Sequence, residues 1–415
     1  MLAMKPLRIS LLTVLICSLV SCNRIVEVPA TKNLEDKFQV SFPQPKSAID
    51  NVVLSDDQDN LVQSLNHLGF NLLEANYCDE GEVLSPLSIY LALSMVINGA
   101  DGNTYKQLAD LLGGNTEAIN GFSSALLKQL PAVDMDARLR LANALIVNED
   151  YSLSGSYKAL VESTFYAPVE TLPFDDESLV LRTVNGWCDK ATEGLIPSII
   201  DEVNPGTMAY LLEALYFKSA WTKPILHTQH FAFAGGEKLD FLCGSEEVLY
   251  GRFDKYEAVA RDYGKNGKYK FYILLPTQKD GLEDMLAILK TKDWKQVAGS
   301  MEKKSITFAF PEFKLGSSMK LKKTLCSLGV TEAFSDKADF SKMFEEKALI
   351  EDVLHKAVVE VDSNGTEAAA VTTVIVESNS ILNEGMIDFF ADHPFVFVIA
   401  ESTSDTILFA GVFEG

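Results

Sequence analysis

Apolar residues recur at helical spacing through the first half of the chain. Between residues 61 and 72, leucine returns every three or four positions, which predicts an amphipathic helix that starts near Asp59. A very apolar segment follows Ser85 and Pro86, and proline suits the first position of a helix that is buried on all sides. The same pattern predicts four further helices, at residues 104–112, 121–130, 157–165 and 179–192.

The second half of the chain is richer in strand patterns. The segment 209–221 is long and largely apolar, so its periodicity fits a strand and a helix equally well. Two short helices are predicted at 282–289 and 320–328. Helices that come first and strands that come later predict an α+β domain and not a repeat of βαβ units. The expected buried strands are 139–147, 270–275, 305–310, 357–361, 393–400 and 406–413.

The N-terminus carries the pattern of an export signal. Lys5 and Arg8 precede an apolar run at 9–20, which is too short to span a bilayer and fits the core of a signal peptide. The run ends in Leu-Val-Ser-Cys22, which resembles the bacterial lipobox, whose cysteine is lipidated and becomes the mature N-terminus. The alternative is ordinary cleavage nearby, with Cys22 as a bystander. We expect a signal peptide at 1–21 and a lipid anchor that holds the protein on the bacterial outer membrane or cell surface, or extracellular release.

The segment after this cysteine has the composition of a linker. Residues 23–58 show neither helical nor alternating periodicity and contain several prolines. We expect residues 22–58 to form a lipidated, flexible tether that lifts a single domain, residues 59–415, off the membrane.

The net charge limits the classes of partner that we expect, and the cysteine spacing indicates whether disulfide bonds form. The 36 basic and 58 acidic residues give a net charge of −22, and phosphate contacts need clustered Lys and Arg, so we expect no nucleic-acid partner. Four cysteines remain after export, and they are far apart without a C-x-x-C pair: Cys78, Cys188, Cys243 and Cys326. We expect mostly buried free thiols and not a disulfide framework.

The chain lacks the compact motifs of common enzymes and cofactor sites. It has no G-x-S-x-G, H-E-x-x-H, P-loop or G-x-G-x-x-G sequence. His227 and His230 could form half of a metal site, but no Cys, Asp or Glu stands beside them, and a surface loop is the preferred interpretation. We therefore expect no catalytic residue, metal or cofactor. A hydrolase assembled from dispersed Ser, His and Asp residues is a distant alternative.

An unusual segment follows the strand predicted at 357–361. It reads Gly-Thr-Glu-Ala-Ala-Ala over 365–370 and continues in a β-prone run to Ser380. Under strand alternation, the even positions from 366 to 376 are all small or apolar, whereas Glu367 and Glu377 share the other face. The pattern fits a half-buried strand, although a glycine and three adjacent alanines make a poor ordinary strand.

This segment resembles the hinge of the reactive loop in inhibitory serpins. The resemblance covers about residues 59–415, and its many separate motifs follow the family's order. The matching motifs are Leu84-Ser85-Pro86-Leu87-Ser88-Ile89, Gly99-Ala100, Leu111-Leu112-Gly113, Ala142-Asn143-Ala144-Leu145, Leu215-Tyr216-Phe217-Lys218-Ser219-Ala220-Trp221, Pro311-Glu312-Phe313-Lys314-Leu315, Leu328-Gly329-Val330, Ala333-Phe334, Ala338-Asp339-Phe340-Ser341, Val353-Leu354-His355-Lys356-Ala357 and Asp392-His393-Pro394-Phe395-Val396-Phe397.

The resemblance implies a fold and a mechanism. It implies three β-sheets with eight to nine helices, and a reactive loop exposed at about 363–390; we expect a monomer. A target protease would cut the loop and form an acyl-enzyme, and the freed loop would insert into the central sheet before the acyl bond is hydrolysed. The protein would then be an inhibitor of serine-type endopeptidases and not an enzyme. The alternative is a non-inhibitory serpin that acts as a binding protein.

The family match also assigns roles to individual residues. Three groups follow: a hinge that enters the sheet first, a shutter under the centre of the sheet, and a breach where the loop enters. The assigned residues are Ser363, Gly365, Thr366, Glu367, Ala368, Ala369 and Ala370 for the hinge, Ser85, Ser88, Glu213 and His355 for the shutter, and Trp221 for the breach. Glu213 stands where the family usually has Asn, and Ser363 stands where it usually has Glu. A charged pair of Glu213 with His355 would make sheet opening pH-sensitive; a neutral substitution is the alternative.

Counting from the hinge places the cut bond at Asn379-Ser380, although the loop is about four residues longer than usual and any bond from 376 to 384 fits. Apolar residues at 374–376 suit an elastase-like or subtilisin-like serine protease. Asn379 also suits an asparagine-preferring cysteine protease. The loop has no basic residue, which argues against trypsin-like targets.

Overall fold

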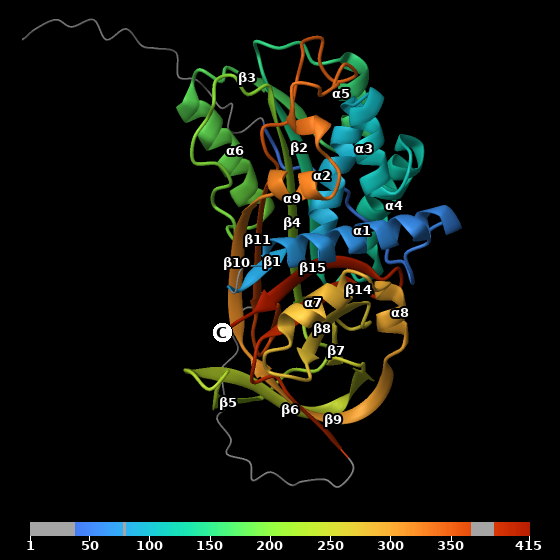
Figure 1. The fold of residues 1–415 in the computed structure, drawn as a ribbon, viewed down its shortest axis with the longest axis vertical. Helices are drawn as coiled ribbons and strands as arrows, with labels where there is room; N and C mark the ends of the chain where they lie inside the picture. The colour runs from blue at the N-terminus through green and yellow to red at the C-terminus, as the bar shows by residue number, and fades with distance from the viewer. Residues whose placement is uncertain (1–37, 78–79, 367–385) are drawn as a thin grey trace, which may run out of the picture. The chain divides into compact units, whose positions relative to one another are not determined.

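The computed structural model describes residues 38–77, 80–366 and 386–415, and residues 38–415 form one compact unit (Figure 1). Within the described residues there are nine α-helices, in agreement with the eight to nine expected. The helices are α1 (Asp56–Asn76), α2 (Pro86–Gly99), α3 (Gly102–Leu112), α4 (Thr116–Val133), α5 (Gly155–Thr164), α6 (Glu177–Ala191), α7 (Leu282–Leu289), α8 (Trp294–Gly299) and α9 (Lys322–Ser327).

The strands alternate with the helices at first and then dominate the chain. They are β1 (Glu82–Leu84), β2 (Arg138–Asn148), β3 (Val169–Leu172), β4 (Ala209–Ala220), β5 (His227–Ala232), β6 (Lys238–Arg252), β7 (Tyr256–Tyr263), β8 (Tyr269–Pro276), β9 (Glu302–Pro311), β10 (Phe313–Lys320), β11 (Leu354–Val361), β12 (Gly365–Thr366), β13 (Ile387–Phe390), β14 (Phe395–Glu401) and β15 (Thr406–Phe413). The α+β class predicted from the order of patterns is therefore confirmed.

Among the residues that the structure describes, the first sheet has six strands in the order β10-β11-β12-β4-β2-β3. The long strands β2 and β4 are antiparallel, with partners from Arg138↔Lys218 to Val147↔Ala209. The short strand β12 is antiparallel to both of its neighbours, β11 and β4. Among the described residues, β11 and β4 are joined only through β12, so most of their length is free to accept another strand between them.

The second sheet has nine strands within the described part of the chain, in the order β1-β15-β14-β8-β7-β6-β9-β13 with β5 on the side of β6. The strand β6 is 15 residues long; it pairs with β9 along most of its length, with β5 over its first residues and with β7 over its last ones. Because this one strand continues through both halves, two of the three sheets that the family resemblance implies are hydrogen-bonded into a single sheet.

The two faces of the first sheet are covered by different elements. On one face, Leu212 and Ala214 of β4 form a core cluster with Trp187 and Cys188 of α6, which lies along β2 and β4 (Figure 1). On the other face, Leu215 and the other core residues of β4 join the main core, where α2 is buried almost all round. Strand alternation therefore places Glu213 on the α2 side, between two core positions.

The N-terminal part of the domain corrects the tether that we expected at 22–58. Phe38 is 6% exposed and packs in the core cluster under α6, where Phe42 also lies. The backbone of Ile49 donates to Ala132, and that of Val52 donates to the Thr403 hydroxyl. The domain therefore begins at or before residue 38 and not at 59, because apolar residues in the aperiodic stretch pack on surfaces that only the folded domain provides. Cys22 and residues 1–37 lie outside the described residues.

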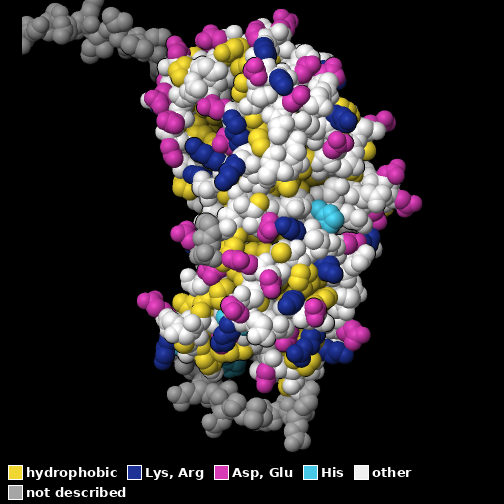
Figure 2. All heavy atoms as spheres, viewed as in Figure 1, with side chains coloured by type: hydrophobic (Ala, Val, Ile, Leu, Met, Phe, Trp, Pro, Cys, Tyr) yellow, Lys and Arg dark blue, Asp and Glu magenta, His cyan; other side chains and the backbone are white. Residues whose placement is uncertain are grey.

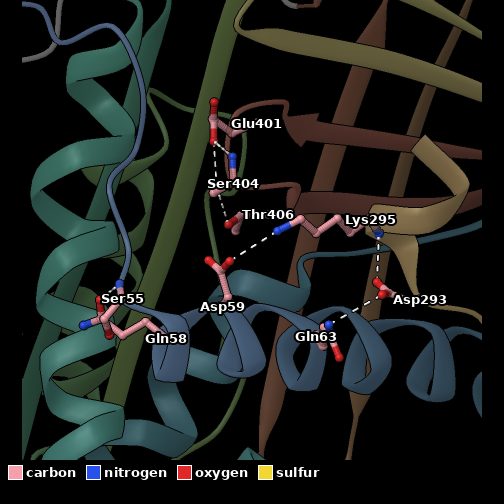
Figure 3. Close-up of polar contacts among 9 residues, drawn as sticks. All are labelled: Ser55, Gln58, Asp59, Gln63, Asp293, Lys295, Glu401, Ser404 and Thr406. Atoms are coloured by element: carbon pink, nitrogen blue, oxygen red, sulfur yellow. Dashed lines mark hydrogen bonds and ion pairs between the residues drawn. The ribbon is translucent and has the colours of Figure 1, made fainter. Parts of the chain in front are cut away.

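Polar contacts join α8 to α1, and a separate set closes the turn between β14 and β15 (Figure 3). Lys295 of α8 forms an ion pair with Asp59 of α1 at 3.2 Å. Glu401 is fully buried, and its carboxylate accepts the backbone N–H groups of Thr403 at 2.7 Å and Ser404 at 2.8 Å. The Ser404 hydroxyl donates to the same carboxylate at 2.6 Å, so three hydrogen bonds to one side chain close this turn.

The sequence pattern predicted some elements correctly and missed several strands. The helix predicted at 282–289 has the same bounds in the structure, and the ambiguous segment 209–221 is the strand β4. However, β5, β6, β7 and β10 were not predicted. In β6 and β10, charged or glycine residues alternate irregularly with apolar ones, because these strands are only partly buried. His227 and His230 lie on β5 and not in a loop, and His230 pairs with Asp240 at 2.6 Å.

The structure tests the prediction of buried free thiols and shows how charges are distributed on the surface. Cys188, Cys243 and Cys326 are free thiols, as predicted, but only Cys188 is buried; Cys78 lies outside the described residues. Figure 2 shows acidic and basic side chains interspersed over the visible face. In the described part of the chain, none of the helices combines the length and apolar character that a membrane span requires.

Candidate functional site

A tight turn returns the chain from β11 into β12. The Asp362 N–H donates to the Gly365 carbonyl at 2.9 Å. The Asp362 carboxylate accepts the backbone N–H groups of Asn364 at 2.6 Å and Gly365 at 3.0 Å. Asp side chains commonly close turns in this way. The turn directs the first hinge residues back along β11, toward β4.

Gly365 and Thr366 occupy the space between β4 and β11. Gly365 is opposite Ala220, and Thr366 is opposite Ser219 on one side and Val361 on the other. Gly365 has a φ of +151°, and a Cβ there would lie 2.1 Å from the Ser219 carbonyl oxygen. Only glycine fits this position. Of the predicted hinge, these two residues already lie in the sheet, whereas Glu367, Ala368, Ala369 and Ala370 lie outside the described residues.

Trp221, the predicted breach residue, lies against the hinge turn. Its indole Nε1–H donates to the Asp362 carbonyl at 2.8 Å, and its backbone N–H donates to the Asn364 carbonyl at 2.9 Å. The indole stacks on the Tyr263 ring at 4.4 Å between centroids. Close by, Ser363 accepts the backbone N–H of Ile225 through its carbonyl. Trp221 therefore joins β4 to the turn through two hydrogen bonds.

Tyr263 is a site residue that the sequence analysis missed. Its hydroxyl is hydrogen-bonded to the Thr366 hydroxyl, although the two residues are 103 positions apart in the chain. Thr366 is 3% exposed and Tyr263 is fully buried. Burial raises the pKa of the Tyr263 hydroxyl well above its usual range, so the group stays neutral. No sequence pattern signals this contact, because β7 reaches the hinge only in the folded domain.

A buried ion pair supports the aromatic cluster. Arg261 is 5% exposed and pairs with Glu246, and its Nη2 donates to the Lys223 carbonyl at 2.9 Å. Its guanidinium lies 4.7 Å from the centroid of the Trp221 ring. Burial lowers the pKa of Arg261, while Glu246 opposes that shift. The breach is thus a buried cluster of aromatic rings with the Arg261–Glu246 ion pair packed against it.

We predict an energetic coupling between Tyr263 and Thr366. Tyr263→Phe and Thr366→Val should each destabilise the intact protein, because each leaves a buried hydroxyl without its partner. The double variant should lose less than the sum, with a coupling of about 1 kcal/mol in denaturant unfolding. Tyr256→Phe, which alters a buried tyrosine at the other end of β7, combined with Thr366→Val is the control and should be additive. Additive losses for Tyr263 and Thr366 would contradict a hydroxyl contact.

Three of the four predicted shutter residues meet at the start of α2. The Ser85 side chain caps the helix by accepting the Ser88 N–H at 3.1 Å. The Ser85 N–H donates to Nε2 of His355 at 3.0 Å, which requires an unprotonated Nε2. His355 is 7% exposed, and burial lowers the pKa of its imidazole to about 4. The imidazole is therefore neutral at pH 7.

Glu213 lies under the same sheet and also faces α2. Its carboxyl is hydrogen-bonded to Ser88, and its Oε1 is buried without a hydrogen-bond partner. Burial raises the pKa of the Glu213 carboxyl from its usual 4.5 to about 8, and the Ser88 hydrogen bond only partly opposes this. The group is thus neutral at pH 7.

The charged pair of Glu213 with His355, which we raised from the sequence, is therefore wrong for this state. Within the described residues, the ion pairs do not include either side chain, and desolvation keeps both neutral. Each one bonds to α2 and not to the other, because their strands, β4 and β11, are not paired at this level. The predicted cut bond, Asn379-Ser380, lies outside the described residues.

Comparisons with known proteins match this arrangement. The family model described as "Serpin (serine protease inhibitor)" matches residues 63–414. Iripin-2 of Ixodes ricinus is 30% identical over 371 residues, covering 86% of this chain and 93% of that protein. Intracellular coagulation inhibitor 2 of Tachypleus tridentatus is 31% identical over 374 residues, covering 85% and 90%. The native-state structure of the thermophilic serpin Tengpin is 26% identical, with a TM-score of 0.78, and covers 91% of this chain and 100% of that one.

Proposed function

The chain belongs to the serpin family, and we propose that it inhibits a serine protease by inserting its own cut loop between β4 and β11. Members of this family act on proteases as inhibitors and not as catalysts, which supports a protein without enzymatic activity of its own. The observation that carries the proposal is β12, which already occupies the start of the space between these strands and pairs with both of them.

The two pairings of β12 predict where a longer inserted strand would lie. Thr366 is opposite Ser219 and Val361, and both pairings are antiparallel. If the antiparallel pairing with β4 continued one residue at a time beyond Thr366, residue 372 would lie opposite Glu213. The independent register with β11 places the same residue opposite His355. The two registers therefore agree on the position of residue 372. An inserted loop would pair with β4 and with β11 without a change of register on either side.

The same registers decide which loop face is buried. Residues directly opposite each other share a face of the sheet, so even-numbered loop residues would lie with Thr366. Ala368 would lie beside Phe217 and Val359, and both of these face the main core. The small residues noted in the sequence thus fall on the buried side, where a large side chain would delay entry. Glu367 would lie on the other face, beside Lys218.

The proposal also includes the class of the target protease and the location of the protein. The apolar residues at 374–376 favour an elastase-like or subtilisin-like protease, and Asn379 favours an asparagine-preferring cysteine protease as a second class. The name of the Tachypleus relative, a coagulation inhibitor, fits a protease partner in general. We also propose that a lipid on Cys22 attaches the exported protein to a membrane.

Covalent complex formation tests the proposal. The purified protein is incubated with elastase, subtilisin and an asparagine-specific cysteine protease, then boiled in SDS and separated by electrophoresis. We expect a band at the summed mass with at least one enzyme, and mass spectrometry should locate the cut between 376 and 384. A protease whose nucleophile has been replaced by alanine is the control and should give no such band. Loop cleavage without a complex for every enzyme would contradict inhibition and favour the non-inhibitory binding protein.

A further inference from the structure

Arg261 is a buried cation in the breach whose hydrogen bonding is incomplete. Its side chain pairs with Glu246 of β6. Its Nη1 is also buried and has no hydrogen-bond partner among the described residues. A buried ion pair contributes little to stability, because the desolvation of both charges offsets their attraction, and an unmet donor adds to the cost. Stability alone therefore does not explain why the breach holds this pair.

The other contacts of Arg261 fall on the chain that leaves β4, residues 221–225, which we call the bridge segment. The guanidinium lies 4.7 Å from the centroid of the Trp221 ring. Its Nη2 donates to the Lys223 carbonyl at 2.9 Å, two residues further along, while its Nε donates to Glu246. The planar fork of an arginine can make all three contacts at once. One side chain thus fixes both the Trp221 ring and the backbone that follows it.

The bridge segment is in turn bonded to the hinge turn. The Trp221 indole and backbone N–H groups donate to the carbonyls of Asp362 and Asn364, at 2.8 and 2.9 Å. The Ile225 N–H donates to the Ser363 carbonyl at 3.2 Å. Three hydrogen bonds therefore connect the bridge segment to three consecutive residues of the turn that places β12 in the sheet.

We propose that Arg261 is a positioning residue for loop insertion, because it holds the bridge segment and thereby keeps β12 in place between β4 and β11. Each acyl-enzyme has two outcomes: insertion of the loop, or attack by water on the acyl bond, which releases active protease and cut inhibitor. Insertion extends from β12, so a displaced hinge turn must first recover its pairing. Loss of Arg261 therefore slows insertion and leaves hydrolysis unchanged. This inference rests on the proposed inhibition and names a residue that sets its efficiency.

Replacing both charges by apolar residues separates this role from a role in stability. Arg261→Met with Glu246→Leu leaves neither charge unpaired, so the intact double variant should melt at or above the temperature of the native protein. The bridge segment nevertheless loses the cation on its indole and the bond to the Lys223 carbonyl. Loss of a cation from a buried indole changes an equilibrium about fivefold or more. We expect the ratio of SDS-stable complex to cut inhibitor to fall by at least this factor, with the rate of loop cleavage unchanged.

The Trp221 indole reports the loosening of the bridge segment in the intact protein, without a protease. Hydrogen exchange of the indole N–H groups is followed by NMR in protein labelled at its tryptophans. Exchange at Trp221 should be faster in the double variant than in the native protein. The indole N–H groups of Trp187 and Trp294 have no partner in the described part of the chain, so their exchange should not change and provides the reference.

Lys290 and Glu74 provide a matched control, because their partly buried ion pair joins the end of α7 to α1. Lys290→Met with Glu74→Leu should keep the native ratio of complex to cut inhibitor. Arg261→Lys keeps the charge without the planar fork; it is the second variant if the double variant folds poorly, and it should also lower the ratio. An unchanged ratio, or unchanged Trp221 exchange, in a folded Arg261 variant would overturn the role of Arg261 and leave the inhibitor proposal standing. Absence of complex for the native protein would overturn both.

Discussion

Replacing Thr366 by arginine should turn the protein from an inhibitor into a substrate. Thr366 is 3% exposed, and its hydroxyl is hydrogen-bonded to Tyr263. An arginine there would bury an unpaired charge, next to the guanidinium of Arg261 on the same strand as Tyr263, which costs several kcal/mol. Insertion would then be slower than release of the cut loop. The protease should still cut the exposed loop, because the substitution lies far upstream of the proposed bond.

The measurement is the ratio of SDS-stable complex to cleaved inhibitor after incubation with the same protease. We expect this ratio to fall more than tenfold in Thr366→Arg, with total loop cleavage unchanged. Thr366→Ser keeps a small hydroxyl and should retain most of the complex. Glu360→Arg places the same side chain on the partly exposed face of β11 and should also remain inhibitory. Equal amounts of complex in Thr366→Arg and the native protein would rule out hinge entry at β12.

Cutting the loop should make the protein much more resistant to heat. From Gly365 to Asn379 the loop has about 15 residues, which span roughly 50 Å as a strand. At about 0.5–1.5 kcal/mol net for each new backbone hydrogen bond, pairing with β4 and β11 contributes on the order of 10–20 kcal/mol. For a unit of this size the entropy of unfolding is about 0.8 kcal/mol/K, so Tm should rise by roughly 10–25 °C.

Calorimetry of intact and cut protein measures this rise. Limited proteolysis supplies the cut form, and mass spectrometry verifies a single cut between 376 and 384. Cut Thr366→Arg is the matched control, because its loop cannot enter at β12 and its Tm should stay near that of the intact protein. Cut native protein that melts with the intact form would show that the loop is not taken up, and the proposed mechanism would fail.

Local patterns in the sequence were sufficient to predict the main helices and to recognise the hinge segment. Apolar spacing placed the helix at 282–289 because helical periodicity is a property of neighbouring residues. The pattern of small residues after Gly365 was visible for the same reason. The strands β6 and β10 were missed because a partly exposed strand has no strict alternation, and the ambiguous 209–221 became a strand only through its pairing with β2.

The amino-acid sequence by itself determined the α+β class, the order of the main elements and the family to which the hinge belongs. The tertiary structure alone decided the rest of the site. It brought Tyr263 and Arg261 to the hinge from β7, packed residues 38–55 onto the domain, and bonded Glu213 and His355 separately to α2. Charge states and hydrogen-bond partners depend on distance and desolvation between segments far apart in the chain, and a linear pattern carries neither quantity.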